Sequence, residues 1–325
     1  MENPGMLIKD SAPRTLKAGK KPSERSIDEL LASGVIALDK VQGPTSHQVT
    51  AWVRDILGIK RIGHGGTLDP HVSGVLPIAT GKATRATDLV LRSDKEYVCH
   101  MKLHKDVPKD KVRAVIATFV GNIYQTPPVR AAVKRQLRIR RVHFINVLEI
   151  DGRNVLFRVG CDAGTYIRTL AVDIGEALGV GANMEALRRT RSGQLAEHDS
   201  YTLQEMKDAV VAWKEDRDET QLRAMVMPFE LLLDPLPKII IKDSAVDAIC
   251  HGADLAAAGV IRLDPGVSKG ATIALFTQKG EGVALGITLM DSESIFKAVE
   301  GNVVRSDRVF MPAGTYPKMW VKQQC

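Results

Sequence analysis

The segment with the clearest potential for chemistry is the glycine-rich stretch RIGHGGTLDPHVSGVL, residues 61–76, with Asp69 near its centre. Glycines allow a backbone to approach a ligand closely. Pro70 disfavours the helical conformation for Asp69, so the carboxylate would be held in one orientation. A fixed carboxylate can act as a nucleophile or as a base. An Asp-Pro pair is also a common start of a turn, and both interpretations stay open at this point.

A carboxylate in such a role needs a partner that keeps it ionised and aimed. Arg168 is a candidate, since the sequence predicts it in the first turn of a helix. A positive charge is unfavourable there because of the helix dipole, and a carboxylate partner could offset that small cost. An ordinary surface arginine would fit the same pattern.

Other kinds of site find no support in this sequence. The loop lacks the Gly-Lys-Ser/Thr of a P-loop and the Gly-x-Gly-x-x-Gly of a dinucleotide site. His64 and His71 flank Asp69 without forming His-x-x-x-His or His-Glu-x-x-His, so we predict no metal site and no cofactor. The four cysteines are far apart, which gives no support to a disulfide framework or to a cysteine zinc site.

The elements that would position these residues mix strands and helices without strict alternation. We therefore expect an α+β fold rather than a doubly wound parallel sheet. Predicted strands cover 34–40, 96–104 and 153–159, and predicted helices cover 46–57, 109–120 and 166–178. We expect Thr45 and Thr165 to cap two of these helices, and Trp52 to lie on a core-facing stripe. Residues 181–193 are expected to start as a helix and end in a basic turn.

The texture of the sequence changes near LDPLP, residues 233–237, where two prolines mark a linker. Lys, Ser, Pro and Gly dominate the first 26 residues. We therefore expect a flexible N-terminal arm over 1–26, one domain over 27–235 and a second, built from short strands, over 236–325.

The basic excess is concentrated before that linker. The chain has 45 Lys+Arg, 38 Asp+Glu and a net charge of +7, whereas residues 236–325 carry only 10 Lys+Arg and 9 Asp+Glu. Residues 130–141 hold six cations and no acid. This run suits docking on a phosphate backbone, although a solvated surface would explain it as well. No membrane span or secretory signal is found, so we expect a reduced, cytoplasmic protein.

Four segments together resemble the motifs of TruB-type RNA pseudouridine synthases. They are LDKVQGPTS (38–46), GHGGTLDPHVSGVL (63–76), CDAGTYIRTL (161–170) and LRRTRSG (187–193). HGGTLDP and PPVRAAVKR (127–135) are similar to the dyskerin branch, the catalytic subunits of box H/ACA ribonucleoproteins. Residues 236–325 resemble a PUA domain. One departure is Val41, which stands where the family usually has proline.

The resemblance implies a catalytic domain with a central mixed or antiparallel sheet, followed by a small β-barrel PUA domain. It implies isomerisation of uridine to pseudouridine in rRNA, and in some cases tRNA, without metal or cofactor. Asp69 matches the catalytic aspartate, Arg168 its arginine partner and Tyr97 a tyrosine beside the target base. His64 and Leu187 match residues of the substrate pocket. The residues expected to bind RNA are Arg130, Lys134, Arg135, Arg188, Arg189 and Gly252.

The expected partners are a box H/ACA guide RNA, the substrate RNA and three small proteins. These are a glycine-arginine-rich-type subunit, a small nucleolar-type subunit and a kink-turn-binding ribosomal-type protein. The absence of long Lys-rich tails favours an archaeal protein; a nucleolar location would be expected only of a eukaryotic one. Three alternatives remain: a stand-alone tRNA T-loop pseudouridine synthase, a non-catalytic RNA-binding scaffold, and a nucleoside hydrolase or glycosidase.

Overall fold

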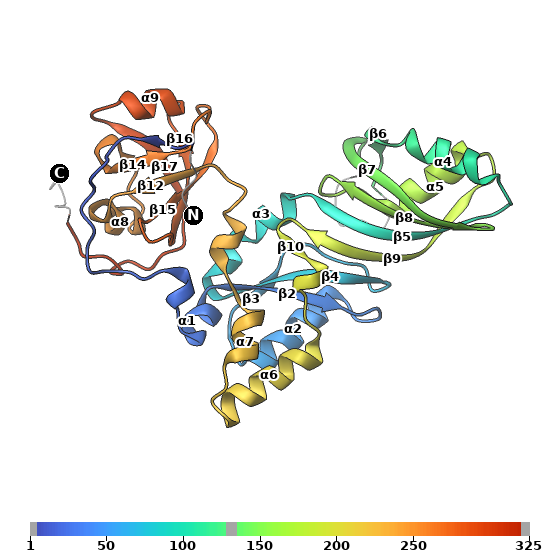
Figure 1. The fold of residues 1–325 in the computed structure, drawn as a ribbon, viewed down its shortest axis with the longest axis horizontal. Helices are drawn as coiled ribbons and strands as arrows, with labels where there is room; N and C mark the ends of the chain where they lie inside the picture. Colours follow the sequence, from blue (N-terminus) through green and yellow to red (C-terminus); the bar gives the residue numbers. More distant parts are fainter. Residues whose placement is uncertain (1–4, 128–134, 320–325) are drawn as a thin grey trace. The chain divides into compact units, whose positions relative to one another are not determined.

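The structure is a computed structural model that describes residues 5–127 and 135–319. It divides into two compact units (Figure 1): a central unit, Val35–Val226, and a terminal unit, Met1–Gly34 with Met227–Cys325. These limits differ from the expected divisions at 26 and 235, because the N-terminal segment belongs with the C-terminal part of the chain. In the described ranges, no helix is long and apolar enough to cross a membrane.

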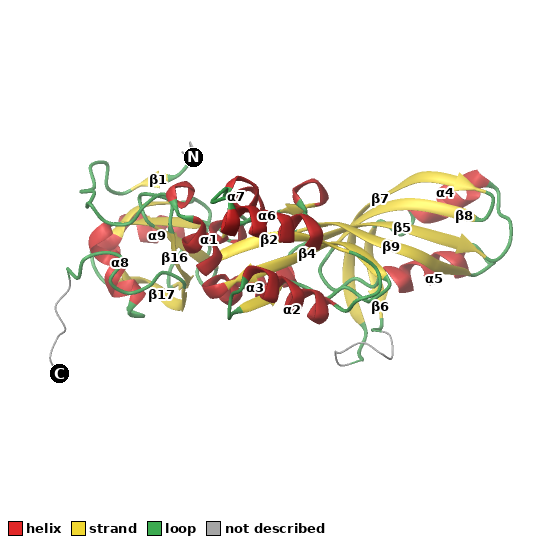
Figure 2. Ribbon diagram, turned by 90° about the horizontal axis from the view of Figure 1, so that it is seen from below, coloured by secondary structure: helices red, strands yellow, loops and turns green. Residues whose placement is uncertain are grey.

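The central unit combines strands and helices, as Figure 2 shows by colour. Its elements are β2 (Gly34–Lys40), α2 (Ser46–Leu57), β3 (Ile62–His64), β4 (Val72–Thr80), α3 (Thr87–Arg92), β5 (Lys95–Leu103), α4 (Lys109–Ala117), β6 (Gly121–Gln125), β7 (Arg138–Asp151), β8 (Asn154–Cys161), α5 (Ile167–Ala177), β9 (Ala182–Ser192), β10 (Leu195–Ala196), α6 (Leu203–Glu215) and α7 (Thr220–Met225).

One mixed sheet runs through the central unit in the order β2, β4, β9, β5, β8, β7 and β6. Neighbouring strands are antiparallel except β4 and β9, which are parallel. β3 pairs with β4 and β10 pairs with β9. The expected α+β fold with a mixed sheet is confirmed.

Helix α2 begins and ends where the sequence predicts. The Thr45 hydroxyl accepts a hydrogen bond from the Gln48 amide at 3.1 Å, and the Gln48 side chain accepts one from the Thr45 amide at 2.8 Å. Gly58 ends the helix in the left-handed conformation, with φ of 68°. Trp52 is 46% exposed, so its expected place in the core is wrong. The buried face is centred on Val49 and Val53, and Trp52 lies outside it.

Residues 182–192 form strand β9, and the expected helix there is wrong. The local sequence, with Met, Glu, Ala, Leu and Arg, favours a helix. However, β9 lies between β4 and β5 and pairs with both. Hydrogen bonding and packing on two sides outweigh a local preference of a few tenths of a kcal/mol per residue.

The terminal unit is built around a seven-stranded sheet in the order β1, β14, β12, β15, β16, β17 and β13. Its elements are β1 (Leu7–Ile8), α1 (Ile27–Ala32), β11 (Met227–Pro228), β12 (Lys238–Ile241), α8 (Asp243–Cys250), β13 (Leu255–Ala256), β14 (Val260–Leu263), β15 (Thr272–Phe276), β16 (Gly282–Thr288), α9 (Ser292–Lys297) and β17 (Asn302–Val309). Short 3-10 turns complete both units. Its core includes Ile239, Val246, Ile273 and Val304, each fully buried.

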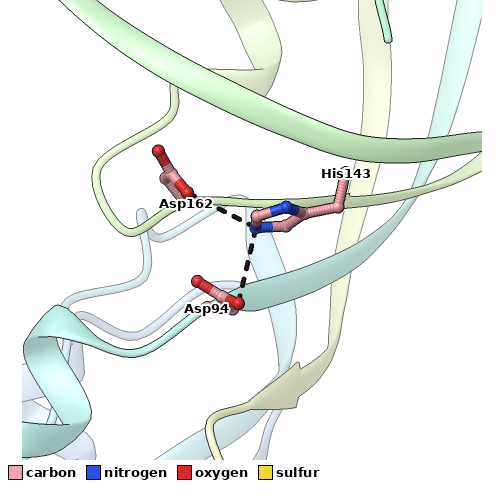
Figure 3. Close-up of side chains that lie close together, drawn as sticks. All are labelled: Asp94, His143 and Asp162. Carbon is pink, nitrogen blue, oxygen red and sulfur yellow. Dashed lines mark ion pairs between the residues drawn. The ribbon is translucent and has the colours of Figure 1, made fainter. Parts of the chain in front are cut away.

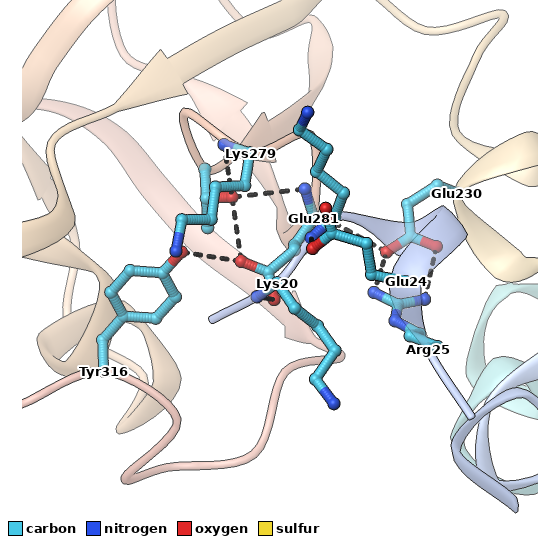
Figure 4. A network of polar contacts seen from close by, with 10 residues as sticks. Lys20, Glu24, Arg25, Glu230, Lys279, Glu281 and Tyr316 are labelled. Carbon is cyan, nitrogen blue, oxygen red and sulfur yellow. Dashed lines mark hydrogen bonds and ion pairs between the residues drawn. The ribbon is translucent and has the colours of Figure 1, made fainter. Parts of the chain in front are cut away.

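The N-terminal segment is an ordered part of this unit from residue 5 onward, which corrects the expected flexible arm. Leu7 and Ile8 add an edge strand to β14. Further along, the Lys20 amide donates to Glu281 at 3.2 Å, and the Tyr316 hydroxyl donates to the same carboxylate at 2.6 Å (Figure 4). The composition suggested disorder, but backbone pairing and buried polar contacts fix the segment.

Candidate active site

Asp69 and Arg168 form an ion pair, although they lie 99 residues apart in the sequence. An Arg168 Nη2 donates to Asp69 Oδ2 at 3.1 Å. Both side chains are open to solvent, with 61% of Asp69 and 55% of Arg168 exposed. Arg168 is the second residue of α5, as predicted. The pairing places a carboxylate, held by a cation, where a ligand can reach it.

The cap of α5 differs from expectation. The residue before the helix is Tyr166, whose side chain makes no capping hydrogen bond. The Thr165 hydroxyl donates to the Asp162 carbonyl at 2.8 Å instead, and stabilises the turn before the helix. Gln125 Oε1 accepts from the Tyr166 amide at 2.9 Å, which gives this helix start a partner from β6.

Two buried side chains fix the loop that carries Asp69. Ser46 Oγ accepts from the Leu68 amide at 2.9 Å and donates to the Leu68 carbonyl at 3.0 Å. Lys40 is 1% exposed, and its ammonium donates to the Val72 carbonyl at 2.9 Å and to the Asp69 carbonyl at 3.4 Å. Burial lowers the pKa of Lys40, and the charge of Asp69 opposes this. The exposed carboxylate therefore stands on a rigid backbone.

Arg189 holds the other side of the same loop. It is 2% exposed, and its guanidinium donates to the carbonyls of Val75 at 2.8 Å and Gly66 at 3.2 Å. Gly74 packs against the Arg189 backbone so closely that a Cβ there would lie 2.2 Å from its carbonyl oxygen. With φ of 101°, position 74 needs glycine for its backbone conformation as well.

Replacing Lys40 with methionine should lower both stability and activity. The Lys40→Met side chain fills a similar space but leaves the Val72 carbonyl without its buried donor. An unsatisfied buried group costs about 1–3 kcal/mol, so we expect the free energy of unfolding to fall by about that amount. Urea unfolding measures this. Lys102→Met on the exposed side of β5 is the control, and an equal loss in both variants would contradict the role of Lys40.

Tyr97 lies in β5 directly opposite Arg189 of β9. Burial raises the pKa of the Tyr97 hydroxyl, and the charge and hydrogen bonding of Arg189 partly oppose that rise. The charge of Asp69 also acts on this hydroxyl and raises its pKa. The phenol is thus kept protonated and is placed within electrostatic reach of the ion pair.

His64 lies in β3, and its ring centre is 4.9 Å from that of His47 in an edge-on arrangement. Burial lowers the pKa of His64, and the neighbouring His47 and Arg189 lower it further. The imidazole is therefore neutral at physiological pH. Leu187, in β9, is 8% exposed and pairs with Val72 beside the loop and with Cys99 of β5. Leu187 therefore places an apolar side chain next to the start of β4, the strand that follows Asp69 in the sequence.

The lowered pKa of His64 predicts a pH dependence of stability. The folded chain resists protonation of His64, whereas the unfolded chain takes up the proton below pH about 6.5. The contribution of the neutral His64 to the free energy of unfolding is therefore fully present above that pH and is lost as the pH falls. Between pH about 7 and about 5, the free energy of unfolding should fall more steeply in the wild type than in His64→Gln. Parallel curves from chemical denaturation would contradict the burial of a neutral imidazole.

The residues expected to bind RNA fall into three groups: those outside the described residues, those on the surface and those that bind other parts of the protein. Arg130 and Lys134 lie outside the described residues, and Arg135, the first residue described after that gap, is exposed. Gly252 is exposed in the turn after α8. Arg188 is held by Asp39 through two hydrogen bonds of 3.0 Å and also by Glu197. The burial of Arg189 does not fit a contact with RNA, because its guanidinium donates hydrogen bonds to loop carbonyls inside the protein.

The sequence reasoning missed Lys40 and Ser46 as residues that position the loop. Both stand in the segment LDKVQGPTS, where the sequence predicts a strand end and the Thr45 cap but no role for either side chain. A charged residue at the end of the apolar strand GVIALDK was the available signal, since a lysine there must find buried acceptors.

Comparison with known proteins shows which family the chain belongs to. The chain is 53% identical over 306 residues to a probable tRNA pseudouridine synthase B of Methanosarcina barkeri, covering 94% of this chain and 90% of that one. The chain belongs to the TruB family of pseudouridylate synthases. A probable tRNA pseudouridine synthase B of Methanocaldococcus jannaschii is 49% identical over 98% of the chain.

Four domain models match this TruB-family enzyme, each over a different range of the chain. Residues 54–167 match the TruB family pseudouridylate synthase N-terminal domain, and 168–234 match the tRNA pseudouridylate synthase B C-terminal domain. Residues 237–310 match a PUA domain, and 2–50 match the DKCLD domain. The PUA resemblance is thereby confirmed, and the ordered N-terminal segment falls within a recognised domain.

Two solved structures share the fold over almost the whole chain. One is a chain in a crystal structure of a Cbf5–Nop10–Gar1 complex, 51% identical, with a TM-score of 0.92 and 96% of each chain covered. The other is a chain of an H/ACA ribonucleoprotein bound to a substrate RNA containing 2′-deoxyuridine. It is 48% identical, with a TM-score of 0.91 and 97% of each chain covered. The dyskerin-type assignment within the TruB family is confirmed.

Proposed function

We propose that this protein is the catalytic subunit of a box H/ACA particle, and that it converts uridine to pseudouridine in RNA by means of Asp69. The observation that carries the proposal is the ion pair between Asp69 and Arg168, with Asp69 exposed on a loop fixed by Lys40, Ser46 and Arg189. A family resemblance alone names the aspartate, and the pairing supports that role because the Arg168 guanidinium orients the carboxylate at 3.1 Å.

The reaction breaks the N1–C1′ bond of uridine, turns the base and forms a C5–C1′ bond. The C5 proton leaves and N1 gains a proton, so the product is an isomer of the substrate. The Asp69 carboxylate acts on the sugar, either by attack on it or by removal of a proton. Arg168 pairs with that carboxylate and orients it toward the sugar as the glycosidic bond weakens.

The residues around the ion pair fit a flipped-out nucleotide. The target uridine must leave its stack because C1′ is shielded within a helix. Leu187 supplies an apolar contact for the base, and the neutral imidazole of His64 adds a flat surface near it. Tyr97, kept protonated by burial, packs against the base and takes part in proton transfer at C5.

The solved structures that this chain resembles favour an enzyme directed to its target by a guide RNA over a stand-alone tRNA enzyme. Solved structures of the same fold include H/ACA and Cbf5–Nop10–Gar1 complexes. Curated relatives carry the name tRNA pseudouridine synthase B, so tRNA remains a second class of substrate. We propose the guide RNA, the substrate RNA and the small H/ACA proteins as partners, and a cytoplasmic location in an archaeal cell.

Reconstitution with and without a guide RNA tests the guided mode. The full chain, the three small proteins and a radiolabelled target would be combined with a matched guide, a mismatched guide or none. We expect pseudouridine at the paired uridine only with the matched guide, with a rate at least about 100-fold above the other two mixtures. Equal modification of a tRNA T-loop and of the target without any guide would favour the stand-alone enzyme.

A further inference from the structure

Three ligand-type side chains other than those of the Asp69 ion pair meet beside β5, β8 and β7 of the central sheet. They are Asp94, His143 and Asp162, and Figure 3 shows both carboxylates directed at one imidazole nitrogen. His143 Nε2 lies 3.4 Å from Asp94 Oδ2 and 3.3 Å from Asp162 Oδ1. In the described part of the chain, no other group of three His, Cys, Asp or Glu residues lies close enough to share an ion.

The sheet register explains why residues so distant in sequence converge. Lys95 of β5 pairs with Cys161 of β8, and Cys161 pairs with Val142 of β7, so these three form one row across adjacent strands. Asp94 and Asp162 stand one position beyond the row. His143 is the extra residue of a β-bulge between Val142 and Phe144. A bulge redirects a side chain, and here the imidazole meets both carboxylates.

The distances from His143 Nε2 to the two carboxylates are those of ion pairs, and they also fit a shared cation. Nitrogen–oxygen hydrogen bonds have their mode at about 2.9–3.0 Å, shorter than both contacts of His143. Zinc binds histidine nitrogen at about 2.0–2.1 Å and carboxylate oxygen at about 2.0–2.2 Å in a tetrahedral arrangement. The edge between two such ligands is therefore about 3.3–3.5 Å, which matches 3.3 and 3.4 Å.

Charge and support also fit a divalent ion. Two carboxylates and an imidazole, as metal ligands, bring two negative charges, which a dication balances. Asp162 is oriented from behind, because its second oxygen accepts from the Arg141 amide at 2.8 Å. The backbone of Asp94 is held too, since its carbonyl accepts from the Gly193 amide at 3.0 Å. The side chains are 34–54% exposed, which leaves a further position open to water.

We propose that Asp94, His143 and Asp162 form a binding site for one zinc-class divalent cation. The bound ion links the start of β5 and the end of β8 to the bulge of β7. Tyr97 follows Asp94 by three residues and Arg168 follows Asp162 by six, so the cation braces both segments that lead to the ion pair of Asp69. Spacing in the sequence does not reveal this site, because Asp94, His143 and Asp162 come from three separate segments of the chain.

Calorimetric titration of the metal-stripped, full-length protein with zinc chloride at neutral pH tests the site. We compare the wild type with His143→Gln, Asp94→Asn and a matched control, His198→Gln. His198 is exposed and lies 3.5 Å from one carboxylate, that of Asp199, in a contact without a second aspartate. The wild type and His198→Gln should bind one zinc ion, and His143→Gln and Asp94→Asn should bind it at least about 100-fold more weakly.

Thermal unfolding provides a second readout that does not depend on activity. Saturating zinc should raise the unfolding midpoint of the wild type and of His198→Gln, since an ion bound only by the folded state stabilises it. The midpoint of Asp94→Asn should not move. Equal zinc affinity in the wild type and His143→Gln, or no zinc binding by the wild type, would overturn the proposal and leave the cluster as a contact of His143 with two carboxylates.

Discussion

Replacing Asp69 with asparagine should reduce the rate of pseudouridine formation at least about 10⁴-fold. The substitution keeps the size of the side chain and removes the charge and the nucleophilic or basic oxygen. Because Asp69 is 61% exposed, its ion pair contributes little to stability, within about 1 kcal/mol. Single-turnover assays on the reconstituted particle measure the rate, and thermal unfolding verifies that Asp69→Asn is folded.

Asp55 offers a matched control for this loss. It is a 64% exposed aspartate paired with Arg54 at 2.9 Å, on the surface of α2. Asp55→Asn removes the same chemical group from a similar ion pair and should leave the rate unchanged within about twofold. Guide and target binding should stay within a few-fold of the wild type in both variants. An active Asp69→Asn enzyme would contradict the assignment of Asp69 as the catalytic carboxylate.

The second large effect is expected at Arg168. Arg168→Met leaves Asp69 without its cation, so the carboxylate becomes mobile and its charged form loses its partner at 3.1 Å. Loss of one preorganised electrostatic contact costs about 10²–10³ in rate, and we expect kcat to fall by this factor with KM changed less than about threefold. Rates measured against target concentration with the guide bound separate the two constants.

Arg168→Lys distinguishes charge from geometry. A lysine keeps the positive charge but lacks the planar fork of the guanidinium, so it should restore the rate only in part. Arg54→Met, which breaks the exposed pair on α2, should leave kcat unchanged. If Arg168→Met were as active as the wild type, Asp69 would be held by the loop alone, and the role of the ion pair would be lost.

Much of this arrangement could be predicted from the sequence, where local signals decide the structure. The cap at Thr45 and the stop at Gly58 define α2 because both act within one helical turn. The pairing of Asp69 with Arg168, which the structure contains, is implied by the family resemblance, whereas the residues alone fit an ordinary surface arginine equally well. The family resemblance also assigned roles that neither residue gave alone.

The failures share a physical cause, which is that distant strands decide the local outcome. β9 is a strand because β4 and β5 lie on either side of it, whatever its own residues prefer. Arg189, expected on the surface, is buried because the same pairing turns its side chain toward the Asp69 loop. The N-terminal segment is ordered because Leu7 and Ile8 find a free edge on β14.

Complete nucleoside analysis of one target RNA tests the central claim most directly. The wild-type particle with a matched guide would be reacted to completion, and uridine, pseudouridine and free uracil would be quantified by mass spectrometry. The account predicts that each uridine lost at the paired position reappears as pseudouridine, with no uracil released and no conversion by Asp69→Asn. Release of free uracil would instead identify a hydrolase and contradict an isomerisation at this site.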